Sequence, residues 1–265
     1  MIAPRIVATD LDGTLLDSTG SVSPRTRRAL GRARDAGADI VFVTARPPRG
    51  VDPIAAMADV TGTAVCSNGG IVYDLDSREI TSTYALDLAA ARKLMETLRE
   101  VLPGVAFAVE TGRHVLVEPA YTRRILPDLP FTREVTDACE EGEPVVKLLA
   151  WSATHAVDEM FTAAVAAVEG QAEVTHSGGS GLLEISAPGV TKAGTLARLC
   201  EERGVDAAEV VAFGDMPNDL AVLAFAGAGY AMANAHHMVM AAVERRTLSN
   251  DDHGVAAVLE GLYGL

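Results

Sequence analysis

The sequence predicts an α/β fold: a Rossmann-like core built on a parallel sheet and interrupted by an inserted α/β domain that contains an antiparallel sheet. Three observations predict it. Apolar runs at 5–9 and 39–43 flank a helical segment, as in a strand–helix–strand unit. Closely spaced strand pairs then replace this alternation in the middle of the chain. The alternation of helices and strands returns from Val190.

The first unit begins with the buried strand 5–9 and closes with the buried strand 39–43. Between them, Ser23 is placed to cap a helix over 24–36 that has a proline at its first position. Gly37 follows the last turn of that helix, where glycine commonly ends helices. These signals predict two parallel strands joined by a crossover helix.

The remaining elements follow from the same periodicities. A third core strand is expected at 63–67, with a turn at 68–70 and a short returning strand at 71–73. The middle section predicts helices at 86–101 and 155–168 and strands at 105–109, 114–117, 144–151, 172–176 and 182–186. Beyond it we expect a helix at 190–203, a strand at 209–213, a helix from Pro217, a strand at 229–232 and further helices. The predicted core therefore comprises residues 1–83 and 188–265, and the inserted domain comprises 84–187.

Composition and charge narrow the classes of function. The chain has 265 residues, of which 49% are hydrophobic, so it can bury a core and is not a disordered segment. Its formal net charge of −14 repels nucleic-acid backbones and anionic membrane surfaces, so we expect neither as a partner. A phosphorylated substrate would then need a metal ion or local cations in its pocket.

Cysteine usage and the absence of targeting signals indicate the cytoplasm. Cys66, Cys139 and Cys200 are odd in number and widely spaced, which favours neither a disulfide framework nor a zinc site. The first residues reach an acidic position at Asp10 too soon for a signal-peptide apolar region, and we find no run long enough to span a membrane. Both a monomer and a dimer are compatible with the sequence.

Two carboxylates follow the first predicted strand. Asp10 comes directly after it and Asp12 two residues later, with Gly13 allowing a tight backbone path. Ligands bind at the carboxyl ends of strands in open α/β sheets. One carboxylate could attack as a nucleophile while the other transfers protons. The alternative is that both residues only form a turn or cap a helix.

Other strand ends carry matching side chains. Thr44 ends the second strand and Arg46 follows it, although a helix cap and a surface cation would look the same. Lys192 lies near the start of the helix after the insertion, where a solvated charge is the alternative reading. Lysine is rare in this chain, however, and a compact ammonium suits a phosphate site.

The segment 214–219 follows the strand 209–213 and supplies Asp215, Asn218 and Asp219. A capping role is the alternative for either aspartate. Together with Asp10 and Asp12, these carboxylates match the few acidic ligands that Mg²⁺ uses beside water and phosphate oxygens. The sequence therefore predicts a magnesium site at this edge of the core sheet.

The run Asp10-Leu11-Asp12-Gly13-Thr14-Leu15-Leu16, with Thr44, Lys192 and the segment 214–219, resembles the four ordered motifs of the haloacid dehalogenase superfamily of phosphatases. An insertion between the second and third motifs is similar to the large α/β cap of the Cof-like subfamily, type IIB. Further similarities are Ser67-Asn68-Gly69-Gly70, Leu183-Glu184-Ile185, Met232-Ala233-Asn234-Ala235 and the segment 250–256. The resemblance thus covers nearly the whole chain.

The resemblance implies hydrolysis of a small phosphate monoester, such as a sugar phosphate, through an aspartyl-phosphate. Asp10 would be the nucleophile, and Asp12 would protonate the leaving oxygen and then activate water. The groups that hold phosphate and substrate would be Thr44, Arg46, Lys192 and Asn218. The metal ligands would be Asp10, Asp215, Asp219 and the backbone carbonyl of Asp12, around Mg²⁺.

Two small departures concern the loops beside the substrate. Ala45 and Ala193 stand where the family commonly has glycine, but neither change removes a reacting group. A phosphomutase of the same cap type would use the same acidic pair, and a catalytically silent sensor of sugar phosphates would keep the fold, so both stay as alternatives.

The inserted domain would act as a cap that selects the substrate. Its candidate contacts are Arg113, His114, Arg123, Arg124 and His176, although each could be an ordinary surface residue. Glycines at 178, 179 and 181 suggest a mobile loop or a plain hairpin turn. Asn68 could face the site or only serve its turn.

Overall fold

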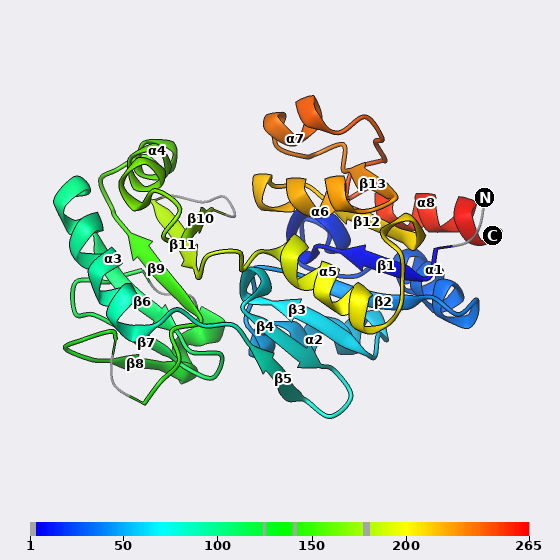
Figure 1. Cartoon of the computed structure of the whole chain (residues 1–265). Coiled ribbons are helices and arrows are strands. Elements are labelled where there is room, and N and C mark those ends of the chain that lie inside the picture. The colour runs from blue at the N-terminus through cyan, green and yellow to red at the C-terminus, as the bar shows by residue number, and fades with distance from the viewer. Residues whose placement is uncertain (1–3, 124–125, 140–141, 177–180, 265) are drawn as a thin grey trace. The chain divides into compact units, whose positions relative to one another are not determined.

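The computed structural model describes residues 4–123, 126–139, 142–176 and 181–264. It divides into two compact units, one formed by Met1–Ser82 with Lys192–Leu265 and the other by Thr83–Thr191 (Figure 1). The first holds a mainly parallel sheet and the second a mainly antiparallel one. The fold class predicted from the sequence is therefore confirmed.

The sheet of the first unit has the strand order β13-β12-β1-β2-β3-β4-β5. Its strands are β1 (Ile6–Thr9), β2 (Asp39–Val43), β3 (Thr63–Cys66), β4 (Ile71–Asp74), β5 (Glu79–Thr83), β12 (Val210–Gly214) and β13 (Ala228–Ala231). The strands from β13 to β3 pair in parallel, and β4 returns antiparallel to β3. Because β1 lies between β12 and β2, the loops after these three strands emerge side by side.

Helices on both faces bury this sheet (Figure 1). They are α1 (Pro24–Asp35), α2 (Pro48–Ala58), α5 (Lys192–Glu202), α6 (Leu220–Phe225), α7 (His237–Ala242) and α8 (Gly254–Tyr263). The predicted cap of α1 is present, since the Ser23 hydroxyl accepts a hydrogen bond from the backbone N–H of Thr26 at 3.1 Å. On one face, Ile6 and Val41 join a fully buried cluster with Leu196 of α5. Burial of each such side chain contributes about 1.5–3 kcal/mol, so the strand that carries the first motif is held firmly.

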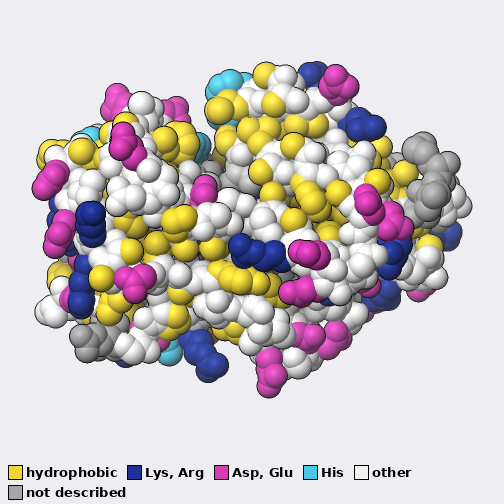
Figure 2. Space-filling view, in the orientation of Figure 1, with side chains coloured by type: hydrophobic (Ala, Val, Ile, Leu, Met, Phe, Trp, Pro, Cys, Tyr) yellow, Lys and Arg dark blue, Asp and Glu magenta, His cyan; other side chains and the backbone are white. Residues whose placement is uncertain are grey.

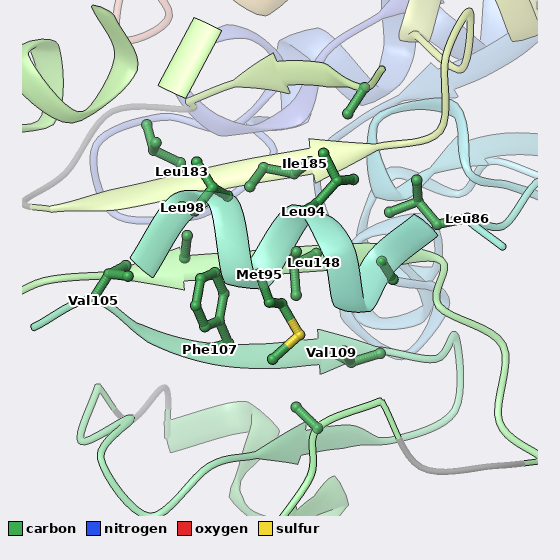
Figure 3. Close-up of a cluster of buried hydrophobic side chains, with 14 of the residues drawn as sticks. Leu86, Leu94, Met95, Leu98, Val105, Phe107, Val109, Leu148, Leu183 and Ile185 are labelled. Carbon is green, nitrogen blue, oxygen red and sulfur yellow. The ribbon is translucent and has the colours of Figure 1, made fainter. Parts of the chain in front are cut away.

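The second unit has a sheet of order β10-β11-β9-β6-β7-β8. Its elements are α3 (Leu88–Val101), β6 (Ala106–Glu110), β7 (Val115–Val117), β8 (Thr132–Glu134), β9 (Lys147–Trp151), α4 (Val157–Val168), β10 (Glu173–Thr175) and β11 (Leu182–Ser186). Among the described residues, neighbouring strands of this sheet pair antiparallel, except that β7 and β8 are parallel. Leu94 and Leu98 of α3 lie on Phe107, Leu148 and Leu183 of the sheet (Figure 3).

The surface mixes charges of both signs. On the face shown in Figure 2, basic side chains occur singly or in small groups among acidic ones. No helix in the described ranges has both the length and the apolar character that a membrane crossing requires. Short helical turns complete the fold at Leu11–Leu15, Ser67–Gly69, Leu126–Phe131, Ala207–Glu209 and Pro217–Asp219.

Candidate active site

The loop after β1 carries the first acidic residues of the site. The backbone N–H of Asp10 donates to the Phe213 carbonyl at 3.1 Å, which continues the pairing of β1 with β12 into the loop. The next residues form one wide turn closed by the Leu16 N–H and the Leu11 carbonyl at 2.9 Å. Inside it, Gly13 has a φ of +76°, and a Cβ there would come within 2.4 Å of an Asp215 carboxylate oxygen. Glycine is therefore required for the turn to approach the neighbouring acidic loop.

Lys192 joins two of the carboxylates. Its Nζ lies 2.7 Å from Asp10 Oδ1 and 2.7 Å from Asp219 Oδ1, and its side chain is only 2% exposed. Burial alone lowers the pKa of Lys192, but the charges of Asp10 and Asp219 outweigh burial and raise it. Burial also raises the pKa of Asp10 above its usual range, and Lys192 opposes that shift. The ammonium therefore stays charged and is fixed beside the Asp10 carboxylate.

The loop after β12 places Asp215 and Asp219. The backbone N–H groups of Asp215 and Met216 donate to Asp219 Oδ2 at 3.1 and 3.0 Å, which fixes that carboxylate. The Thr14 hydroxyl donates to Asp215 Oδ1 at 2.8 Å. Burial raises the pKa of Asp215 to about 6, although the Thr14 hydrogen bond works against the shift. Thr14 was not among the predicted site residues. Its position four residues after Asp10, in the same loop, was the sequence feature that could have indicated it.

Three buried carboxylates could hold a metal ion. Among the described residues, Asp10, Asp215 and Asp219 each offer an oxygen, and these oxygens lie within 4.8 Å of one another. One ammonium beside three carboxylates leaves an excess of negative charge that a divalent cation would offset. Carboxylate oxygens are the donors that Mg²⁺ prefers. The residues present therefore fit the magnesium ion that the sequence predicts.

The Asp12 side chain is not part of this carboxylate cluster. Arg46 donates to it through Nε at 2.7 Å and Nη2 at 2.6 Å, in a two-pronged ion pair. The Asp12 side chain is 59% exposed and the Arg46 side chain 38%, so water screens the pair. Thr44 is buried at the end of β2, and its hydroxyl accepts from the Arg46 backbone N–H at 3.1 Å. Asp12 lies in the same loop as Asp10, but its side chain pairs with Arg46 from the loop after β2.

Asn218 contacts the turn after β3. Its Nδ2 donates to Asn68 Oδ1 at 3.2 Å. Ser67 and Asn68 have φ values of 51° and 57°, which strain non-glycine residues. The Asn68 N–H also donates to the Thr44 carbonyl at 3.0 Å. Asn68 therefore does more than form a turn, because it ties the loop after β3 to those after β2 and β12.

The candidates in the second unit have different surroundings. Arg113 and His114 are exposed, and Arg123 is half-buried. His176 is 8% exposed and lies edge-on to the Phe161 ring, with 5.4 Å between ring centroids. Arg124 and the glycines at 178 and 179 lie outside the described residues.

A buried ion pair in the second unit was not anticipated. Lys147 Nζ lies 2.5 Å from Glu184 Oε1, and both side chains are 5% exposed. Strand alternation places them on the face opposite Leu148 and Leu183, which pack against the helices. Lysine and glutamate in apolar strands were the only sequence signal for this pair.

Comparison with known proteins identifies the family. The sequence model described as haloacid dehalogenase-like hydrolase matches residues 7–259. The chain belongs to the haloacid dehalogenase-like hydrolases. The resemblance seen in the sequence motifs is therefore confirmed, as is the expectation that the protein is a hydrolytic enzyme.

Several members of this family align over nearly the full chain. Pyridoxal phosphate phosphatase YbhA of Escherichia coli K12 is 28% identical over 282 residues, covering 98% of this chain and 97% of the relative. The 5-amino-6-(5-phospho-D-ribitylamino)uracil phosphatase YwtE of Bacillus subtilis 168 is 27% identical, covering 97% and 98%. The solved HAD subclass IIB sugar phosphatase BT4131 has a TM-score of 0.80 at 20% identity, covering 97% and 99%, and shares the fold.

Proposed function

We propose that this hydrolase is a Mg²⁺-dependent phosphatase that cleaves a small phosphate monoester, such as a sugar phosphate, through an aspartyl-phosphate on Asp10. The observation that carries the proposal is the cluster of Asp10, Asp215 and Asp219, with their oxygens within 4.8 Å and Lys192 bridging two of them. The two curated relatives are named for different phosphorylated metabolites, which supports a small phosphorylated substrate without selecting one. The proposed setting is the cytoplasm, with the protein as a monomer or a dimer.

In the first step, an Asp10 oxygen attacks phosphorus and the ester P–O bond breaks. The departing oxygen takes the electron pair and receives a proton from Asp12. In the second step, Asp12 removes a proton from water, whose oxygen attacks the same phosphorus. The bond between phosphorus and Asp10 then breaks, which releases inorganic phosphate and restores the carboxylate. The solvent exposure of Asp12 favours this role, because its side chain can exchange Arg46 for substrate and water.

The surrounding groups would position the phosphoryl group. The Thr44 hydroxyl and the Lys192 ammonium would contact its oxygens, with Arg46 and Asn218 on the substrate side. Asp10, Asp215, Asp219 and the Asp12 backbone carbonyl would hold Mg²⁺, which when bound offsets the charge of phosphate and carboxylates. The unit Thr83–Thr191 would serve as the cap that selects the leaving group.

The test is release of inorganic phosphate from p-nitrophenyl phosphate, measured with Mg²⁺ and with a chelator. We expect metal-dependent turnover that Asp10→Asn abolishes, whereas Asp35→Asn, at an exposed position at the end of α1, leaves it unchanged. Intact-mass analysis after acid quench should show a phosphorylated wild-type species that Asp10→Asn lacks. Folded protein that binds phosphate esters without releasing phosphate would instead support a sensor, and phosphoryl transfer to a sugar would support a mutase.

A further inference from the structure

Two asparagines from the C-terminal part of the chain hold the loop that carries Asp12. Asn234 Nδ2 donates to the Gly13 carbonyl at 2.8 Å, and Asn250 Nδ2 donates to the Leu16 carbonyl at 2.9 Å. The two asparagines are also joined to each other, because the Asn250 backbone N–H donates to Asn234 Oδ1 at 3.0 Å. We call Asn234 and Asn250 the asparagine clamp.

The clamp is placed where the backbone has no regular pattern of its own. Asp12 has φ −75° and ψ 120°, and Gly13 has φ 76° and ψ −1°, so the turn Leu11–Leu15 is not helical throughout. Carbonyl groups in such a turn lack the regular helical partner and bond to side chains or water instead. A side-chain amide suits both bonds of Asn234, since it donates to Gly13 through nitrogen and accepts from Asn250 through oxygen.

The segment that carries Asn234 also contacts the other acidic loop. The His236 N–H donates to the Asp215 carbonyl at 2.8 Å, and the Met232 N–H donates to the Gly214 carbonyl at 3.2 Å. One short stretch of chain after β13 therefore contacts both loops that supply the carboxylate cluster. Its position fixes how far the loop around Gly13 lies from Asp215.

We propose that Asn234 and Asn250 are positioning residues that set the geometry of the carboxylate cluster through the Asp10–Leu16 loop. The catalytic consequence rests on the phosphatase function proposed above, whereas the effect on the loop does not. Mg²⁺ demands near-ideal placement of its ligands, and a misplacement of about 1 Å in a catalytic site can lower the rate roughly a hundredfold. Asn234 is exposed, so its removal weakens this geometry more than it weakens the fold.

The decisive variant is Asn234→Asp, which keeps the shape and the acceptor but cannot donate to the Gly13 carbonyl when ionised. Ala233→Asp is the matched control, because it adds the same charge at the adjacent exposed position and leaves both clamp amides in place. Amide hydrogen exchange of residues 11–16 is measured by mass spectrometry in metal-free protein. Calorimetric Mg²⁺ binding and p-nitrophenyl phosphate kinetics follow on the same samples.

For Asn234→Asp we expect exchange of residues 11–16 to be about tenfold faster, Mg²⁺ binding about tenfold weaker and kcat roughly 10- to 100-fold lower, with KM within about threefold. Asn250→Ala should act in the same direction, and the double variant should lose less than the product of the two single effects. Exchange rates for 11–16 that match those of Ala233→Asp would overturn the proposal. So would faster exchange with Mg²⁺ affinity and kcat both unchanged, since the clamp would then serve stability only.

The two proposals fail in different ways. A wild-type protein that releases no phosphate from p-nitrophenyl phosphate in Mg²⁺ counts against the phosphatase alone. In that case hydrogen exchange and Mg²⁺ calorimetry decide the clamp, because neither measurement needs turnover. Faster loop exchange together with weakened Mg²⁺ binding in Asn234→Asp would still support it, and wild-type values in either measurement would reject it.

Discussion

Replacing Lys192 by methionine should destabilise the metal-free protein strongly. The Lys192 ammonium lies 2.7 Å from carboxylate oxygens of both Asp10 and Asp219, and its side chain is 2% exposed. Methionine keeps most of the volume, so the change removes mainly the charge and leaves the carboxylates uncompensated. Removing one partner of a buried ion pair costs about 3–5 kcal/mol. For a domain of this size about 1 kcal/mol corresponds to roughly 2–4 °C, so we expect Tm to fall by about 6–20 °C near neutral pH.

This loss should depend on pH in a defined direction. Burial already raises the pKa of Asp10 and brings that of Asp215 to about 6, and in both cases Lys192 opposes the shift. Without Lys192 both folded-state pKa values rise further above their unfolded values. A buried carboxyl group of this kind costs little stability while it is protonated. It lowers the free energy of unfolding as the pH rises through its folded-state pKa. The deficit should therefore be small near about pH 5 and should grow as the pH rises above about 6, the pKa of Asp215 in the wild type.

Thermal unfolding of metal-free wild type and Lys192→Met across this pH range tests the reasoning. Lys93→Met is the control, because Lys93 is exposed on α3 and its loss should change Tm little. Lys147→Met breaks the buried pair with Glu184 in the other unit, so it should lower stability without changing Mg²⁺ affinity. A Lys192→Met deficit that equals that of Lys93→Met, or that does not grow with pH, would refute the charge argument.

Three further predictions concern the same loops. In urea unfolding, Gly13→Ala should destabilise the fold far more than Gly20→Ala. Both glycines have φ +76°, but only a Cβ at Gly13 would meet Asp215, at 2.4 Å. Equal losses of stability would contradict the close approach of the Gly13 turn to Asp215. Added Mg²⁺ should raise Tm more at about pH 8 than at about pH 5.5, because protons compete with the metal for Asp215, whose pKa is about 6. Equal increases of Tm at the two pH values would argue against Asp215 as a metal ligand. Arg46→Met should change stability by less than about 1 kcal/mol, because its ion pair with Asp12 is exposed. It should still lower kcat/KM on the order of tenfold, because the substrate loses a positioning contact. An unaffected kcat/KM would show that Arg46 has no part in the reaction.

Much of the fold could be predicted because its signals are local. Apolar runs bounded by cap and turn residues gave β1, α1 and β2 within one residue. The missed elements lack those signals. The helix α2 begins at Pro48 and contains Pro53, and proline is a poor signal for a helix interior. The strand β5 has exposed and half-buried residues in alternation, of which only Ile80 is apolar. Edge strands bury too little apolar surface to show a clear pattern.

Part of the site could likewise be predicted from local signals, and part could not. Asp10, Asp215 and Asp219 could be expected to meet, because the loops after adjacent parallel strands emerge at one edge of a sheet. Lys192 begins α5 and follows no strand of this sheet, so only the resemblance to the family motifs indicated its place beside them. The partner of Asp12 could not be foreseen, since it depends on how two exposed side chains are oriented. The clamp depends on irregular loops after β13 and before α8, whose backbone path no periodicity encodes.

The adjacency of β1 and β12 has a consequence for how this enzyme is made. Ile6 pairs with Val210 and Thr9 with Phe213, so these two adjacent strands are separated by some two hundred residues of sequence. Pairing strands so far apart in sequence requires a large loss of chain entropy, which slows folding. During synthesis, Asp10 leaves the ribosome long before Asp215, and the whole intervening unit can fold first. A chain stopped short of β12 would retain Asp10 and Asp12 but lack Asp215 and Asp219. Tight Mg²⁺ binding would therefore report that the chain has grown beyond β12 and that β12 has joined the sheet.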